Sequence, residues 1–238
     1  MNDHVRIAGF TVRKTTAAQL ASDLLARMQA SSSSVLLFAN TNFIVKCRGL
    51  ILQMNEPGVL IVNDGIGMDI AAKFIYRERF PENLNGTDFT PYLLGRAQRP
   101  LRLFLLGAKP QVAAHAADYA RQQLGQEVVG VCDGYAGMNE IRLLERIERT
   151  QPDILLVALG NPVQEQWIMQ NRQVLNVPLV MGVGALFDFW AGAKPRAPRA
   201  IQILRLEWLY RLCLEPRRLL RRYTVDIVRF FLYCHRYR

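Results

Sequence analysis

Apolar and polar positions follow two different periods along this chain. Between the helical stretches lie six short runs that are almost entirely apolar, at residues 35–39, 59–62, 101–106, 127–131, 154–159 and 179–183. In the longer stretches the apolar residues recur every three or four positions, as on one face of a helix. Because strands that are apolar throughout are covered on both faces, the pattern predicts a Rossmann-like α/β fold, a parallel sheet with helices on both faces.

Other segments complete the predicted order of elements. Residues 5–12 predict a strand pair broken at Gly9, and Thr15 or Thr16 is placed to cap the helix that follows. We expect further helices at residues 43–54, 66–76, 111–124, 139–150, 201–214 and 217–238, and another that opens near Pro162. The pattern changes after Trp190, where a proline-containing loop leads into helices rich in arginine. The sequence therefore predicts an α/β catalytic domain at 1–193 and a basic amphipathic helical appendage at 194–238.

Charge is distributed unevenly between these two parts. Residues 194–238 contain one lysine and eleven arginines against three acidic residues, a net charge of +9, so the first 193 residues carry only +1 of the total of +10. A cationic segment of this kind binds anions, which are phospholipid head groups, substrate phosphates or nucleic acid.

The cysteines and the chain ends add expectations about location. Cys47, Cys132, Cys213 and Cys234 form no CxxC pair, which favours four reduced thiols over a zinc site or a disulfide framework. The N-terminal residues lack the apolar region of a signal peptide, and no window of about 18 uninterrupted apolar residues occurs. We therefore expect a chain that neither carries a signal peptide nor spans a bilayer.

Polar residues and glycines gather where the predicted strands end. Asp64, Gly107, Tyr135, Asn161 and Gly184 each follow a strand or lie in the loop after it. Ligands of open α/β sheets bind beyond the carboxyl ends of the strands, so we expect these residues at one binding edge.

Each candidate has an ordinary structural explanation beside a functional one. Asp64 stands in an Asp-Gly turn pair, but a carboxylate at that edge also suits the removal of a proton from a sugar hydroxyl. Asn40 and Asn42 follow another strand, where they suit a helix cap or hydrogen bonds to sugar hydroxyls.

Four more residues suit a nucleotide. Gly107 precedes a helix whose first amides favour phosphate, although the segment is neither a GxGxxG nor a P-loop motif, which disfavours NAD and ATP as ligands. Tyr135 could stack on a base, Gln164 could bind phosphate or sugar, and Asp188 could accept hydrogen bonds from a nucleoside. The three histidines have no acidic partner at a useful spacing, so hydrolase chemistry has no support.

Nine short motifs occur in an order that resembles one enzyme family. They are Asp64-Gly65-Ile66-Gly67, Gly86-Thr87-Asp88, Asp133-Gly134-Tyr135, Gly160–Glu165, Gly182–Asp188, Arg196-Ala197-Pro198, Glu207–Leu212, Glu215-Pro216 and Arg221-Arg222-Tyr223. In this order the chain resembles the WecG/TagA/CpsF glycosyltransferases, glycosyltransferase family 26, over nearly its whole length.

The resemblance implies an inverting transfer of a sugar from a UDP-sugar to a polyprenyl-diphosphate-linked sugar, with no metal or other cofactor. It implies that Asp64 is the catalytic base, that acceptor and sugar contacts come from Asn40, Asn42 and Gln164, and that Tyr135, Gln164 and Asp188 bind the nucleotide. Gly107 and Asn161, at the strand ends, are further candidates for the nucleotide, and Asn83 is a further candidate for the sugar. The resemblance also implies that the C-terminal appendage completes the active site and docks on the cytoplasmic face of the bacterial inner membrane, with Arg211, Arg218 and Arg221 holding the diphosphate.

Two departures from the family pattern bear on the donor sugar. Asn40-Thr41-Asn42 replaces the usual Thr-x-Asn, and Asn83 stands where an arginine is frequent. The chain is closer to the exopolysaccharide branch of GumM, which favours UDP-glucose as donor over UDP-N-acetylmannosamine or its uronic acid.

Two rival interpretations and one open question remain beside this. A non-enzymatic protein that binds nucleic acid through the basic tail would leave the polar residues at the strand ends unexplained, so we expect no nucleic-acid partner. A nucleotide-dependent oxidoreductase lacks its glycine motif. Assembly of the chain into a homo-oligomer is left open.

Overall fold

The computed structural model describes residues 3–30, 32–135, 142–198, 201 and 206–237, and within them eight strands form one sheet. The order across the sheet is β1-β2-β4-β3-β8-β7-β5-β6. All neighbouring strands pair in parallel except β1 and β2, which form an antiparallel hairpin. The strands are β1 (His4–Ile7), β2 (Phe10–Arg13), β3 (Ser34–Ala39), β4 (Val59–Asn63), β5 (Arg102–Gly107), β6 (Glu127–Cys132), β7 (Ile154–Ala158) and β8 (Leu179–Gly182).

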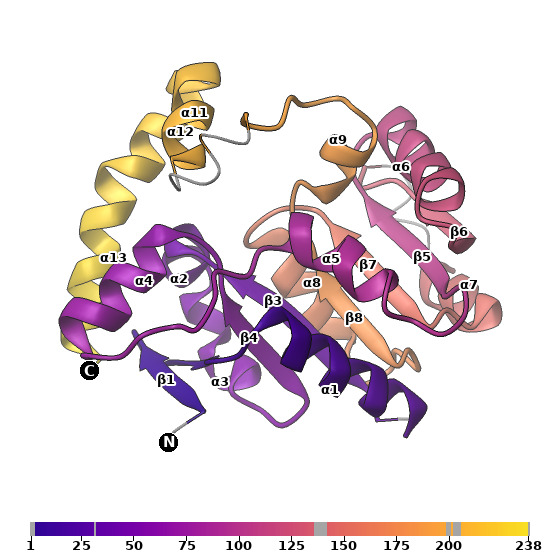
Figure 1. The fold of residues 1–238 in the computed structure, drawn as a ribbon, viewed down its shortest axis with the longest axis horizontal. Coiled ribbons are helices and arrows are strands. Elements are labelled where there is room, and N and C mark those ends of the chain that lie inside the picture. Colours follow the sequence, from indigo (N-terminus) through magenta and orange to yellow (C-terminus); the bar gives the residue numbers. More distant parts are fainter. Residues whose placement is uncertain (1–2, 31, 136–141, 199–200, 202–205, 238) are drawn as a thin grey trace.

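Helices cover both faces of this sheet, as Figure 1 shows. One hydrophobic core gathers side chains from α2 (Thr41–Lys46), α4 (Ile66–Ile70), α7 (Leu143–Thr150), α8 (Val163–Asn171) and α13 (Val225–Arg236). The other gathers side chains from α1 (Ala17–Gln29), α5 (Gly86–Leu94), α6 (Pro110–Gln122) and α9 (Leu186–Trp190). The predicted Rossmann-like fold is therefore confirmed, and β3, β7 and β8, whose described side chains are all buried, explain the continuous apolar runs.

The first predicted helix cap is also confirmed. Thr16 has an extended backbone, its side chain accepts a hydrogen bond from the Gln19 amide, and the Gln19 side-chain oxygen accepts one from the Thr16 amide. This reciprocal pair is a capping box, which satisfies two amides that the helix itself leaves without partners.

The predicted single helix at 43–54 is wrong. The chain forms α2, then a 3₁₀ turn at Arg48–Leu50, then the short helix α3 (Ile51–Met54). The break follows Cys47, which is buried, and the Arg48 guanidinium donates to the Ala8 carbonyl at 2.9 Å and lies over the Tyr233 ring. Contacts to both ends of the chain thus fix the backbone here against its local preference.

The predicted helix at 217–238 is also divided. It consists of α12 (Pro216–Tyr223) and α13, separated at Thr224, whose φ of −116° and ψ of −82° are not helical. The break turns α13 so that Phe230 and Cys234 are fully buried in the core that also holds Phe43. The preceding helix, α11, spans Glu207–Leu214, and residues 202–205 of the helix predicted at 201–214 lie outside the described residues. Residues 139–141 of the helix predicted at 139–150 also lie outside them, and its later part forms α7.

Helix α13 is also tied to the body by hydrogen bonds. The Tyr76 hydroxyl accepts from the Ala8 amide at 3.2 Å and donates to the Cys234 carbonyl at 3.0 Å. This part of the predicted appendage therefore shares a core with the α/β body, and the division of the chain at residue 193 stays a prediction. In the described ranges, every helix is too short or too polar to cross a bilayer.

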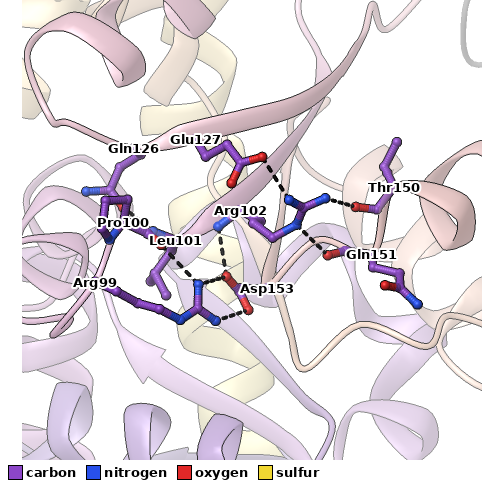
Figure 2. Close-up of polar contacts among 9 residues, drawn as sticks. All are labelled: Arg99, Pro100, Leu101, Arg102, Gln126, Glu127, Thr150, Gln151 and Asp153. Atoms are coloured by element: carbon purple, nitrogen blue, oxygen red, sulfur yellow. Dashed lines mark hydrogen bonds and ion pairs between the residues drawn. The ribbon is translucent and has the colours of Figure 1, made fainter.

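A polar cluster ties the amino ends of β5, β6 and β7, at the opposite edge from the predicted site (Figure 2). The Arg99 guanidinium donates to both Asp153 carboxylate oxygens, at 2.8 and 2.9 Å, and the Arg102 amide donates to the same carboxylate at 2.8 Å. Arg102 also pairs with Glu127 at 2.8 Å. These contacts join the amino ends of three neighbouring strands, so the cluster helps to order this edge of the sheet.

Candidate active site

A cavity of about 970 Å³ opens at the carboxyl ends of the strands and is bounded on its other side by the C-terminal helices. Its strand-end side, as we call it below, consists of the side chains and loops that follow β3–β8. Its helical side consists of α11, α12, the start of α13 and residues 194–198. The charged residues that line it are Lys46, Asp64, Lys109, Asp188, Lys194, Arg196, Glu207, Arg221, Arg222 and Asp226.

Asp64 follows β4 directly and lies half-buried on the cavity wall. Its amide donates to the Ala39 carbonyl at 2.7 Å, which extends the pairing of β3 with β4 to the rim of the sheet. The next residue, Gly65, has a φ of +92°, a backbone conformation that side chains disfavour. The sheet thus fixes the backbone of Asp64, and the glycine turns the chain into α4.

The predicted sugar contact Asn83 lies behind this turn. Its side-chain oxygen accepts a hydrogen bond from the Gly65 amide at 2.6 Å, and it is not among the residues that line the cavity. The geometry therefore gives Asn83 the task of holding the loop that carries Asp64.

Asn40 caps a helix, as predicted, and also contacts Asp64. Its Oδ1 accepts from the Phe43 amide at 3.1 Å and caps α2, while its Nδ2 donates to Asp64 Oδ2 at 3.1 Å. The Arg222 Nη2 from α12 donates to the same Oδ1 at 3.3 Å. Asn40 thus joins Asp64 on the strand-end side to an arginine on the helical side, and Asn42 lines the cavity beside it.

Gln164 and Glu165 form a buried network at the start of α8. Gln164 Oε1 accepts from the amides of Gly160 at 3.2 Å and Gly184 at 3.0 Å, which joins the loops after β7 and β8. Glu165 Oε1 accepts from Gln164 Nε2 at 2.7 Å and from Asn161 Nδ2 at 2.6 Å. One N–H of each amide is thus engaged by the Glu165 carboxyl, and both residues also line the cavity.

Burial raises the pKa of the Glu165 carboxyl, and the hydrogen bonds from Gln164, Cys47 and Asn161 offset only part of that rise. Burial and the neighbouring Glu165 together raise the pKa of the Cys47 thiol. The pair is therefore biased towards its neutral forms, which suits a structural role beneath the cavity.

The segment after β5 brings a helix terminus to the cavity. Gly107 has a φ of +128°, and a Cβ there would lie 2.4 Å from the Ala158 carbonyl oxygen, so only glycine fits. Gly107 itself is behind the surface, and Ala108, Lys109 and Val112 line the cavity at the start of α6. Free amides and a lysine at a helix terminus suit a phosphate group.

Tyr135 and Asp188 occupy the same side of the cavity. The Tyr135 amide donates to the Asp133 carboxylate at 2.8 Å, and the ring is 63% exposed. Asp188 lies in α9, 3.7 Å from the ammonium of Lys194. An exposed ring beside a carboxylate suits a nucleoside base and its sugar.

A comparison with protein families decides the class of this site. The family model described as the glycosyl transferase WecG/TagA/CpsF family matches residues 5–238. This chain belongs to that family. Membership of the WecG/TagA/CpsF family makes the protein a glycosyltransferase and implies, in general terms, a nucleotide-sugar donor and a lipid-linked acceptor in surface-polysaccharide synthesis.

The cavity brings most of the predicted site residues of this family member together. Asp64, Asn40, Asn42, Gln164, Tyr135, Asn161, Asp188 and Arg221 line it. Asn83 and Gly107 stand one layer behind. Arg211 lies in α11 and Arg218 in α12, but their side chains are outside the described part of the structure.

Sequence reasoning missed several cations of this WecG/TagA/CpsF site. Lys46, Lys109, Lys194, Arg196 and Arg222 all line the cavity. Arg222 belongs to the motif Arg221-Arg222-Tyr223, which could have indicated its place in the site. Lys46 is at the end of α2, and no sequence pattern marks it. Within the residues described, no three His, Cys, Asp or Glu side chains group as metal ligands.

Proposed function

We propose that this protein is an inverting glycosyltransferase that moves a hexose, preferentially glucose, from a UDP-sugar to a polyprenyl-diphosphate-linked sugar. The observation that carries the proposal is Asp64, a carboxylate on the wall of a cavity that cations surround. Family membership supports the transfer itself, and the residues of the cavity support the roles that follow.

The proposed chemistry is one displacement. The acceptor hydroxyl oxygen forms a bond to the anomeric carbon while the bond from that carbon to the UDP phosphate oxygen breaks, and UDP leaves with the electron pair. Asp64 accepts the proton of the hydroxyl. The hydrogen bond from Asn40 Nδ2 to Asp64 Oδ2 orients the carboxylate on the cavity wall.

Cationic side chains are proposed to stabilise the charge on UDP and on the acceptor diphosphate. Lys109 at the start of α6 and Arg221 and Arg222 on α12 line the cavity, and guanidinium groups bind phosphate oxygens in pairs. Tyr135 is proposed to stack on uracil, with Asp188 at the ribose. We expect this chain to need no metal, so transfer should persist in EDTA.

We further propose that the protein acts as a peripheral protein at the cytoplasmic face of the inner membrane. The exposed faces of α11–α13 combine apolar residues with arginines, a composition that suits a bilayer interface. The exposed apolar residues are Trp208, Leu209, Leu214, Leu220, Val225, Val228 and Leu232.

The deciding experiment is a UDP-release assay with a polyprenyl-diphosphate-linked sugar as acceptor. UDP-glucose, UDP-N-acetylmannosamine and UDP-N-acetylmannosaminuronic acid are compared, and we expect acceptor-dependent release to be fastest with UDP-glucose. Faster release from either of the other donors would correct the sugar, and no acceptor-dependent release from any donor would reject the proposal.

A further inference from the structure

Helix α4 and the π-helical turn after it, Ala71–Ile75, carry an apolar stripe that faces outward. Ile66 is 38% exposed, Ile70 36% and Phe74 73%, at a spacing of four residues. The opposite face is buried through Met68, Ala71 and Ala72. We call Ile66, Ile70 and Phe74 the α4 stripe.

The α4 stripe is apolar where a surface helix is ordinarily polar. A solvent-facing helix of a soluble protein carries polar residues on its outer face, and contiguous exposed apolar residues indicate an interaction site. At a rise of about 1.5 Å per residue, the stripe extends over roughly 12 Å. It begins two residues after Asp64, so it leads away from the cavity wall itself.

Cations surround the far end of the α4 stripe. Lys73, Arg77 and Arg79 are exposed, and the Lys73 ammonium lies 5.5 Å from the centre of the Phe74 ring. The nearby acid Glu78 is bound to Lys14 at 2.7 Å, which neutralises it. Apolar residues flanked by such cations are complementary to a surface that is apolar inside and anionic outside.

A second apolar face lies beside the stripe. Helix α13 contacts the π-helical turn and runs next to α4, as Figure 1 shows. Its outer face exposes Val228 and Leu232, with Arg229 and Arg236 between and beyond them. Both helices are fixed on the body, because Met68 of α4 and Phe230 of α13 are fully buried in the same core.

We propose that the α4 stripe is a membrane-docking surface of the catalytic body itself, which enters the interface of an anionic phospholipid bilayer together with the outer face of α13. This inference rests on the proposed function, because a lipid-linked acceptor places the reaction at a bilayer. Since α4 begins at the turn after Asp64, docking through the stripe sets the carboxylate at the level of the acceptor head group.

The test uses substitutions in the full chain, because removing the tail would also remove Phe230 and Cys234 from the core. The variant is Ile70→Ser with Phe74→Ser. The matched control is Leu52→Ser, at a residue that is 84% exposed on α3 and outside the stripe. Phe74 and Leu52 are largely exposed and Ile70 is partly exposed, so the melting temperature of each protein should stay within about 4 °C of the wild type.

Binding is measured by flotation with phosphatidylglycerol vesicles. The double variant loses two apolar side chains that the proposal buries in the bilayer, so its partition into vesicles should weaken by about tenfold or more. The Leu52→Ser protein should partition like the wild type. Equal flotation of the double variant and the control overturns the proposal, as does a wild type that does not float. A double variant with unchanged flotation but a lower mass in sedimentation velocity would assign the stripe to contact between copies of the chain.

A parallel assay separates this inference from the proposed function. UDP release is measured with the acceptor in vesicles and with a short-chain, water-soluble acceptor. We expect the double variant to lose about tenfold with the vesicle acceptor and to match the wild type with the soluble one. Equal loss with both acceptors overturns the docking role. A wild type that is inactive on both acceptors rejects the proposed function, and the flotation experiment then tests the α4 stripe by itself.

Discussion

The two sides of the cavity are held together in different ways. On the strand-end side, the Gln164–Glu165 network contains four hydrogen bonds of 2.6–3.2 Å, all buried or partly buried. On the helical side, the described links to the body are made by charged side chains that are partly exposed. Arg222 reaches Asn40 at 3.3 Å, Lys194 lies 3.7 Å from Asp188, and Arg196 pairs with Asp88.

This difference indicates that the strand-end side positions polar groups, whereas the helical side supplies charged groups. Buried hydrogen bonds hold polar groups in place without a ligand, whereas partly exposed ion pairs contribute little and exchange readily for a better anion. The strand-end side is therefore suited to orient the base and the sugar, and the helical side to close on a diphosphate.

The largest expected effect tests the strand-end side at its proposed catalytic group. Asp64→Asn keeps the size of the side chain and removes the base, so kcat should fall by about 10²–10⁴-fold. Isothermal titration should find UDP bound as in the wild type, because the nucleotide contacts are elsewhere. Turnover within about threefold of the wild type would reject Asp64 as the base.

The next effect tests the helical side. Arg222→Ala removes the guanidinium that meets Asn40, and loss of a charge-assisted contact of about 1.5–3 kcal/mol predicts a decrease in kcat/KM of roughly 10–150-fold. The control is Arg217→Ala, which changes the net charge equally on α12 but is not a cavity residue. Equal losses in both variants would show that the total charge of α12 matters and the position of Arg222 does not.

The sequence predicted the strand-end side better than the helical side, for a physical reason. A buried strand such as β7 has a purely local signature, so its position and the loop carrying Asn161 follow from the apolar run. The breaks at Cys47 and Thr224 depend on contacts with residues far along the chain. The contact of Arg222 with Asn40 joins residues 182 positions apart, and the motif that contains Arg222 does not indicate which residue it meets.

A smaller effect tests the internal support of the strand-end side. Glu165→Ala leaves the Asn161 and Gln164 amides without their acceptor, which should lower the free energy of unfolding by about 1–3 kcal/mol. Glu165→Gln retains an acceptor oxygen and should cost less. Chemical denaturation of both variants measures the difference, and equal losses would mean that the two hydrogen bonds contribute nothing.

The free energy of unfolding of the wild type and of Glu165→Gln should depend on pH in different ways, and the sign of the difference follows from the pKa of Glu165. Burial raises the pKa of Glu165 in the folded protein above its ordinary 4.5, so the folded state binds this proton more tightly than the unfolded state. The stability from this group is fully present below pH 4.5 and is lost as pH rises through the raised pKa. Glu165→Gln should therefore gain stability relative to the wild type between pH 4 and pH 8, and a difference independent of pH would contradict the assignment.

The smallest effect concerns the link between the two sides at Lys194. Its ammonium is partly exposed and 3.6–3.7 Å from two carboxylates, a geometry whose contribution to stability is about 0–1 kcal/mol. Lys194→Met should therefore leave the melting temperature almost unchanged and raise the KM for the UDP-sugar by a few-fold at most. Because dissolved salt screens the attraction between partly exposed charges, the change in KM should become smaller still in about 1 M salt. A tenfold or larger change that survives high salt would show that Lys194 contacts the bound nucleotide closely, and that the helical side is as fixed as the strand-end side.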